Sequence, residues 1–338
     1  MGTFLQEIFF RFGGAFLSWE TEDELEPSCV GILSEAIEYV VNQTDVRLRC
    51  LPGYSKRLRA PVAATFRYVD ELVNGVPGAI SCCRSTFSND PRVSAFFVDP
   101  RHLQEVFSQS AQVRDLLEVN PEVAECWALL CMRKDERQRL GMSLVGDAVH
   151  RDVMQTAVSF TDHQVLASGS SEADARRSLK CCIFKGLLGH IGKQVGDAKT
   201  RVMQLDIRRK SLHRRRMKAA SEEEAKSQDE LQAKIDEMER ELAQGIPRLL
   251  CLEDHMDFVV DVLRSPDQYL SGRACSIRLS RLGIKLEGEP AGAGNEIPLY
   301  VIQVASHGPR VGALVRFPRT ELLPPQDFVR RADLFLTL

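Results

Sequence analysis

The sequence predicts an α+β fold with a helical N-terminal part and an antiparallel meander, a long antiparallel coiled-coil hairpin arm, and a small β-rich C-terminal module. Three observations lead to this prediction. Apolar residues at heptad spacing lie in a proline-free stretch from residue 171 to residue 246, helix start signals recur in the first 120 residues, and short apolar segments follow residues 125 and 274. We therefore expect three regions, at residues 1–170, 171–245 and 246–338.

The composition is that of a globular protein. The chain has 338 residues, of which 44% are hydrophobic and 27% charged, and its net charge is −3. This length allows two or three structural units, and the apolar content is too high for a disordered chain. Because no apolar run reaches 18 residues, the sequence predicts no membrane-spanning helix. The small net charge means that nucleic-acid binding would require a local basic patch.

Ten cysteines bear on the cellular compartment. Most lie inside apolar stretches, as Cys126 and Cys131 do, where a free cysteine behaves as a small hydrophobe. No C-x-x-C motif is present, and the adjacent pairs Cys82–Cys83 and Cys181–Cys182 have poor spacing for zinc. We expect reduced structural thiols in a cytoplasmic protein, with no bound metal and no cofactor.

The first 120 residues predict short helices. Apolar residues recur at helical spacing over 32–41 and over 60–73. The dipeptides Asp90-Pro91, Asp99-Pro100 and Asn120-Pro121 each place a capping side chain before a proline. A cap oxygen accepts an otherwise unpaired amide, and proline at the first helical position loses no hydrogen bond. We therefore expect helices that begin at residues 91, 100 and 121.

An antiparallel meander is predicted to follow. Its strand candidates are residues 126–132, 140–145 and 153–160, and we expect the charged segment 133–139 to be the loop between the first two. The first candidate is also compatible with a helix, because Asn120-Pro121 is a good helix start and short apolar runs do not separate the two structures.

The arm has the strongest pattern in the chain. A heptad seam, with a missed position at Arg209, runs through Leu188, Ile191, Val195, Ala198, Val202, Leu205 and Leu212. A second seam consists of Leu231, Ile235, Met238 and Leu242. Between them, Ser221 and Glu224 form a capping-box pattern, which indicates a new helix start. We expect two antiparallel helices, and Gly186 and Gly189 in the first to mark a bend or a close helix crossing.

Charge distinguishes the two arm helices. Six cations lie near the expected hairpin tip, namely Arg208, Arg209, Lys210, Arg214, Arg215 and Arg216. The following segment, 222–241, contains nine acids and three basic residues. Pairing between a basic and an acidic helix favours the hairpin. A free basic tract would instead bind nucleic-acid phosphates, although no aromatic side chain is interleaved for base stacking.

The C-terminal region is expected to contain one helix, four strands and a final short helix. These elements are predicted at residues 252–263, 275–279, 283–286, 297–304, 311–317 and 325–336. The result is a small β-rich module that packs on the N-terminal body, with the arm inserted between them.

One polar cluster is the best enzyme candidate. Seven polar residues lie within 17 positions, namely Asp147, His150, Arg151, Asp152, Gln155, Asp162 and His163. If adjacent antiparallel strands brought His150 or Asp152 near His163, the group would hold a metal or act as an acid–base pair. The spacing matches no metal motif, turns are normally rich in Asp and Arg, and known nucleotide and hydrolase motifs are missing. The sequence therefore assigns no catalytic residue.

Two resemblances complete the sequence analysis. Segments 146–147, 151–156, 160–163 and 310–315, together with the coiled coil, resemble conserved hypothetical proteins of bacteria, which implies a bacterial cytosolic setting and transfers no functional residue. Residues 279–286 resemble a fragment of the PilZ barrel signature, but Leu279 stands where an acidic residue is expected and no Arg-x-x-x-Arg lies upstream. This second resemblance implies only that residues 279–286 form a turn similar to one in a PilZ barrel.

We expect a scaffold, adaptor or regulatory protein that binds a protein partner, or its own copy, through the arm. Arg214, Arg215 and Arg216 would make the contact. The first alternative is a nucleic-acid-associated protein that uses the same basic tract. The second is an enzyme with its site around His150, Asp152 and His163.

Overall fold

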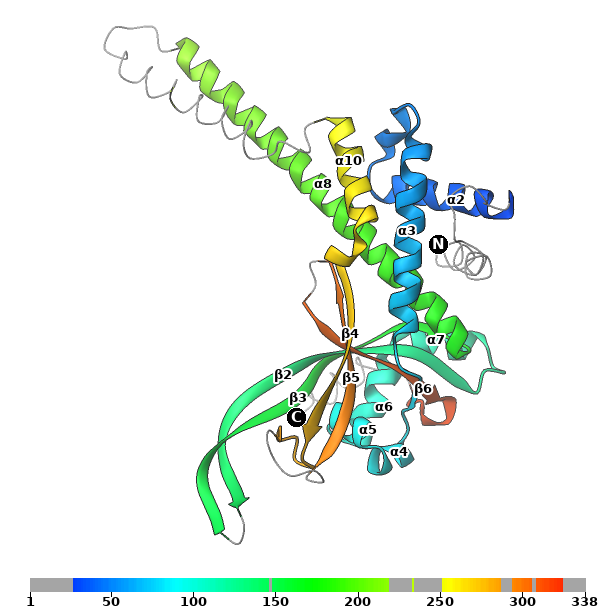
Figure 1. Ribbon diagram of the computed structural model, residues 1–338, viewed down its shortest axis with the longest axis vertical. Coiled ribbons are helices and arrows are strands. Elements are labelled where there is room, and N and C mark those ends of the chain that lie inside the picture. The colour runs from blue at the N-terminus through cyan, green and yellow to red at the C-terminus, as the bar shows by residue number, and fades with distance from the viewer. Residues whose placement is uncertain are drawn as a thin grey trace, which may run out of the picture. The chain divides into compact units, whose positions relative to one another are not determined.

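The computed structural model describes residues 27–145, 148–218, 233, 251–286, 294–305 and 308–324. They form an α+β fold with N-terminal helices, a curled six-stranded sheet and one long helix (Figure 1). The chain divides into two compact units, one made of Met1–Tyr68 and Phe184–Tyr269 and the other of Val69–Ile183 and Leu270–Leu338. Across the described residues, no helix combines the length and the apolar composition needed to cross a membrane.

The first unit is helical. It contains α2 (Pro27–Gln43), the 3-10 helices η2 (Val46–Cys50) and η4 (Pro266–Gln268), α10 (Leu252–Arg264), and parts of α3 (Tyr54–Asn74) and α8 (Glu172–Lys218). In its core, Phe66 of α3 stacks on Phe184 of α8 with ring centroids 4.7 Å apart. The buried Thr65 hydroxyl donates to the carbonyl of Leu263, 2.6 Å away, and so ties α3 to α10. The helices predicted at 32–41, 60–73 and 252–263 are confirmed.

The second unit begins with short helices, and N-cap side chains determine where two of them start. Strand β1 (Ile80–Ser81) precedes α4 (Arg84–Asn89), α5 (Pro91–Phe96), α6 (Pro100–Gln109) and α7 (Ala111–Val119). Asp90 accepts the amide of Arg92, and Asp99 accepts that of His102. The predicted starts at 91 and 100 are confirmed. The start at 121 is wrong, because Asn120 is the C-cap of α7 and a strand begins at Glu125.

The sheet of this unit runs in the order β3-β2-β6-β5-β4, with β1 parallel to β6. Its other strands, all paired antiparallel, are β2 (Glu125–Val145), β3 (Ala148–Gly169), β4 (Leu270–Leu279), β5 (Asn295–Val304) and β6 (Arg310–Pro318). Buried apolar side chains from the sheet and from α5–α7 form one core, in which Phe107 stacks on Phe317. Segments on either side of the arm therefore share one sheet.

The predicted meander is instead one long ribbon. Strands β2 and β3 pair from Trp127 opposite Gly169 to Val145 opposite Ala148, as the green ribbon in Figure 1 shows. The expected loop at 133–139 is wrong, because these residues lie within β2. From residue 133 to residue 142 of β2 most side chains are exposed, so charged residues replace the apolar alternation that marks a half-buried strand.

Irregularities in β3 accompany the curl of the ribbon. Asp152, Asp162 and Ala167 have positive φ values of 61°, 52° and 55°. Each lies beside one of the three register shifts between β2 and β3. Such bulges add twist and bend a strand, and Asp tolerates the left-handed region better than most residues. The three sites therefore account for the bending of a ribbon that would otherwise be flatter.

The strand predicted at 283–286 is reduced to two isolated bridges. Ile284 pairs with Ala157 of β3, and Lys285 pairs with Leu279 of β4. The amide of Val158 donates to Gly283, and that of Lys285 donates to Thr156, both at 2.8 Å. Gly283 has φ +72°, which permits the tight turn from Ser280. This turn joins the end of β4 to the middle of the edge strand β3.

The first arm helix is confirmed, because α8 runs unbroken for 47 residues. The second arm helix, expected over 221–244, and the short helix expected over 325–336 lie outside the described residues, apart from the helical Ala233. The close crossing occurs at Gly192, where a Cβ would lie 2.7 Å from the carbonyl oxygen of Gln43. Gly189 faces open space, so it marks no crossing.

The described cysteines are all free thiols, and several are buried. Burial raises the pKa of Cys126 and Cys131 to about 12, because a thiolate would be poorly solvated there. These two residues are therefore protonated, unreactive members of the core, as their apolar sequence surroundings predict.

Candidate functional site

The foot of the arm is organised by one buried carboxylate in the first unit. Asp45 is the N-cap of η2, and only 4% of its side chain is exposed. It accepts the amide and guanidinium of Arg47, at 3.2 and 3.0 Å. Oxygen Oδ2 also accepts Nζ of Lys199, at 2.8 Å, and Nδ1 of the buried His255, at 2.9 Å. One side chain thus connects η2, α8 and α10.

The electrostatics of this site keep Asp45 ionised. Burial opposes its charge, but the hydrogen bonds from Arg47, Lys199 and His255 outweigh burial and hold the pKa of Asp45 well below its usual range. The cations of Arg47 and Lys199 keep partial contact with water, at 60% and 39% exposure. The carboxylate therefore gains charge-assisted bonds without burying its partners completely.

The Asp45 site also fixes the path of the chain. Lys199 precedes the distal part of α8, and His255 follows the start of α10, yet both contact the same oxygen atom. The two ends of the segment between them, 200–254, are therefore held at one place. This arrangement is required for a hairpin, and sequence spacing alone does not reveal it.

The distal part of α8 has two different faces. Val195 is the last buried side chain among those described in the helix, and Val202, Leu205 and Leu212 of the seam are only partly exposed. Met203 and Ile207 are 60% and 58% exposed. At about 100° per residue, these two side chains lie on the side of the helix opposite the seam.

The basic residues lie on different sides of the helix. Arg201 and Arg208 flank the seam, whereas Lys210 and Arg214 lie seven residues after Met203 and Ile207 and therefore on the outer face with them. Lys210 pairs with Asp206 at 2.7 Å, and so does Arg209 at 3.0 Å. The side chains of Arg208 and Arg214 are exposed and form no ion pair among the described residues. The side chains of Arg215 and Arg216 lie outside the described part of the chain.

The described members of the polar cluster of the sequence lie spread along one strand. His150, Asp152 and His163 all lie on β3, and the Cα partner of His150 is Ser143 near the end of the ribbon. At about 3.3 Å per residue, His150 and His163 are roughly 40 Å apart along the strand. The expectation that neighbouring strands bring these groups together is therefore wrong, because one continuous strand separates them.

His163 has a structural environment. Its Nε2 donates to the carbonyl of Phe96 at 2.7 Å, and its ring stacks on Phe97 with centroids 5.3 Å apart. Burial lowers the pKa of His163, because the charged ring would lose water. Its neighbour Asp162 instead pairs with Arg310 at 2.7 Å. Within the described ranges, no group of three or more His, Cys, Asp or Glu side chains is placed to hold a metal ion.

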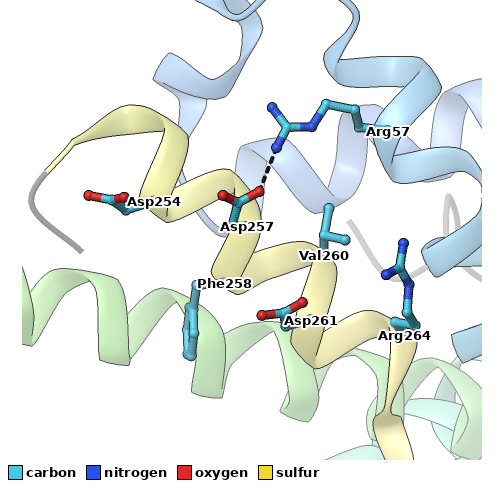
Figure 2. Close-up of a pocket in the computed structure, with 7 residues that line it drawn as sticks. All are labelled: Arg57, Asp254, Asp257, Phe258, Val260, Asp261 and Arg264. Atoms are coloured by element: carbon cyan, nitrogen blue, oxygen red, sulfur yellow. Dashed lines mark hydrogen bonds and ion pairs between the residues drawn. The ribbon is translucent and has the colours of Figure 1, made fainter. Parts of the chain in front are cut away.

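An open hollow of about 510 Å³ lies between α3 and α10 in the first unit (Figure 2). Arg57 of α3 spans it and bonds Glu253 and Asp257 of α10, each at 2.6 Å. Asp254 accepts the amide of Cys251 and so caps the helix. The sequence analysis missed this ion-pair cluster, because about 200 positions separate Arg57 from its partners and no short-range pattern marks it. Its contacts fix α10 against α3.

Searches against protein-family models, curated proteins and solved structures found no match to this chain.

Proposed function

We propose that this protein is an interaction protein, a scaffold or adaptor, that binds a partner through a hairpin arm made of distal α8 and residues 221–244. The observation that supports it most directly is the double contact of Asp45 with Lys199 and His255. Because Lys199 and His255 contact the same carboxylate, the two ends of a hairpin between them would lie side by side.

Length and charge agree with this proposal. From Thr200 to Lys218, α8 extends about 28 Å at roughly 1.5 Å per residue. The segment after Ser221 carries a capping box, a heptad seam and nine acids over a similar length. Acids on that segment would meet Arg201 and Arg208, which flank the seam at the g positions of a coiled coil.

The partner surface is then the outer face of α8. A hairpin that closes on its seam leaves Met203 and Ile207 exposed on the opposite side. Exposed apolar side chains set among charges are typical of protein contacts, in which an apolar centre is surrounded by a polar rim. We therefore assign the contact to a protein with a complementary apolar patch.

Replacing residues 200–250 with a Gly/Ser linker tests the arm. A flexible linker of about eight residues, which spans roughly 15 Å, joins Lys199 to Cys251 in this variant. We expect the remaining protein to fold, as measured by circular dichroism and a urea midpoint close to that of the full chain. Self-association in sedimentation experiments and co-purified proteins should be lost. If both were unchanged, the arm would not be the binding element.

A surface double variant localises the contact. Met203→Asp with Ile207→Asp should reduce partner binding at least tenfold, whereas Gln194→Asp, at an exposed position on another side of the same helix, should retain it. Helix content measured by circular dichroism should be equal in the two variants. Equal binding by both variants would exclude the outer face.

The second candidate function is nucleic-acid binding, and it is favoured by the exposed Arg208 and Arg214, which form no ion pair within the described ranges. It predicts that the affinity for labelled RNA or DNA falls by orders of magnitude between about 50 and 200 mM salt. The affinity should also be lost in Arg214→Glu with Arg215→Glu. Absence of binding at low salt would leave the protein partner as the function of the arm.

A further inference from the structure

A groove of about 870 Å³ lies in the second unit. Its walls come from α4 and α5, from the middle of β3, and from the turn between Ser280 and Gly283. The floor is apolar and buried, and it consists of Phe96, Val158, Phe160, Leu279 and Ile297. This volume is in the range of sites that hold small molecules or short peptide segments.

The rim exposes apolar surface. Val98 and Leu282 are 82% and 81% exposed, the highest values among the large apolar side chains of the described residues. Both line the groove, so their exposure is concentrated at one place. Concentrated apolar exposure around a concave surface marks a binding site more reliably than scattered residues do.

The edge of β3 offers backbone groups to this groove. Thr156 and Val158 use their outward-facing groups to bond Lys285 and Gly283. Because backbone direction alternates along a strand, Phe160 also directs its N–H and C=O away from β2. Among the described residues, Phe160 has no backbone partner on that side. The backbone bonds that residues 283–285 make to β3 therefore end at Val158. The next outward-facing N–H and C=O of the strand, those of Phe160, can accept a further strand.

Charge favours an acidic ligand. Arg281 is the one charged side chain among the described residues that line the groove, and no described carboxylate pairs with it. The remaining polar lining is neutral: Ser88, Asn89, Ser94, Ser159, Ser280 and Asn295. A carboxylate beside Arg281 would complete the charge balance of the rim.

We propose that the groove binds an extended peptide of another protein, which adds a short strand to β3 beside Phe160. Alternate side chains of the peptide enter the apolar floor, and an Asp or Glu of the peptide pairs with Arg281. Backbone bonds to an open sheet edge supply affinity, and the pockets for alternate side chains supply specificity. This second binding surface is independent of the arm.

A library of random dodecapeptides displayed on phage, selected against the full chain, provides the probe. The selected sequences should alternate apolar residues and share an Asp or Glu. A fluorescein-labelled consensus peptide is then titrated by anisotropy. Methylation of one central peptide amide should weaken binding roughly tenfold, because a backbone hydrogen bond is lost. The proposal would be overturned if the selection enriched no peptide sequence. It would also be overturned if the peptide bound equally well whichever of its amides was methylated.

Paired variants test the location. Ser94→Trp fills the groove from an exposed position and should abolish binding, whereas Gln112→Trp on α7 should not. Arg281→Glu should weaken the consensus peptide at least tenfold, and Arg273→Glu on the exposed part of β4 should leave it unchanged. Peptide binding that survives Ser94→Trp would overturn the assignment. Self-association of the chain that is lost in Ser94→Trp would replace the external peptide with a second copy.

Discussion

Two charge clusters, one in each unit, differ in the way they contribute to the fold. The Asp45 site in the first unit gathers Arg47, Lys199 and His255 around a carboxylate that is 4% exposed. In the second unit, the β2–β3 ribbon carries the pairs Arg133–Asp135 and Lys134–Glu136, at 3.0 and 2.8 Å. The distances are similar, but the four ribbon side chains are between 22% and 57% exposed.

Burial, rather than bond length, decides the consequence. Exposed pairs in water contribute about 0–1 kcal/mol, so the backbone ladder holds the ribbon and its charges do not. A buried carboxylate with several donors is different, because removing it takes an acceptor from the buried His255 and removes several charge-assisted bonds at once. The comparison predicts large effects of substitution at Asp45 and very small effects on the ribbon.

The largest expected effect is that of Asp45→Ala. It removes the N-cap of η2 and the acceptor of Lys199 and His255, and we expect the free energy of unfolding to fall by about 3 kcal/mol. Urea denaturation of the full chain measures this change in the free energy of unfolding. Asp267→Ala, an exposed carboxylate in the same unit, is the control and should change stability by less than about 0.5 kcal/mol. Equal effects of the two variants would contradict the role of Asp45.

The pH dependence of this contribution has a definite sign. The pKa of Asp45 is lowered in the folded protein, so its stabilisation is complete above the unfolded pKa of about 3.9. The stabilisation declines as the pH falls from there toward the folded pKa. The difference in unfolding free energy between the wild type and Asp45→Asn should therefore be constant from pH 7 to pH 5 and smaller at pH 3. A larger difference in unfolding free energy at pH 3 than at pH 7 would contradict the predicted sign.

An intermediate effect is expected from packing at the foot of the arm. Gly192→Val places a side chain against the Gln43 carbonyl and should cost roughly 1–3 kcal/mol. Gly189→Ala faces open space in the same helix and should stabilise the protein by about 0.5–1 kcal/mol. Thermal denaturation of the two variants should shift in opposite directions. If Gly189→Ala also destabilised the protein, the higher helix propensity of alanine would not be the dominant effect at position 189.

The smallest effect is predicted for the ribbon. Lys134→Ala with Glu136→Ala removes an exposed pair, and the urea midpoint should stay within experimental error of the wild type, at low and at high salt. A clear shift would show that this pair holds the ribbon, and the contrast between the two clusters would fail.

Local patterns predicted much of the fold, and particular residues show why. Asp90 and Asp99 cap α5 and α6 as expected, because a cap depends only on neighbouring residues. The same pattern at Asn120-Pro121 failed, since the next residues pair with β6 and the sheet prevails over a local start. Likewise the sequence identified α8 but missed β2 across 133–139, where no buried face imposes an apolar alternation on the strand.

The candidate sites depended more on tertiary structure. The sequence placed Arg208 and Arg214 correctly on a long helix, but it grouped His150 with His163, which one strand holds apart. Neither Asp45 nor the groove at Arg281 had a sequence signal, because their members come from distant segments.

By itself, the sequence determined the elements that a local period or cap specifies: the α5 and α6 starts, the 47-residue α8 and the basic character of its distal part. The tertiary structure alone decided that Lys199 and His255 meet at Asp45 and that the bonds on the outer edge of β3 stop before Phe160. The physical reason is the range of the interactions. Helix periodicity and capping act within a few residues, whereas a buried carboxylate and an open sheet edge exist only after distant segments have packed together.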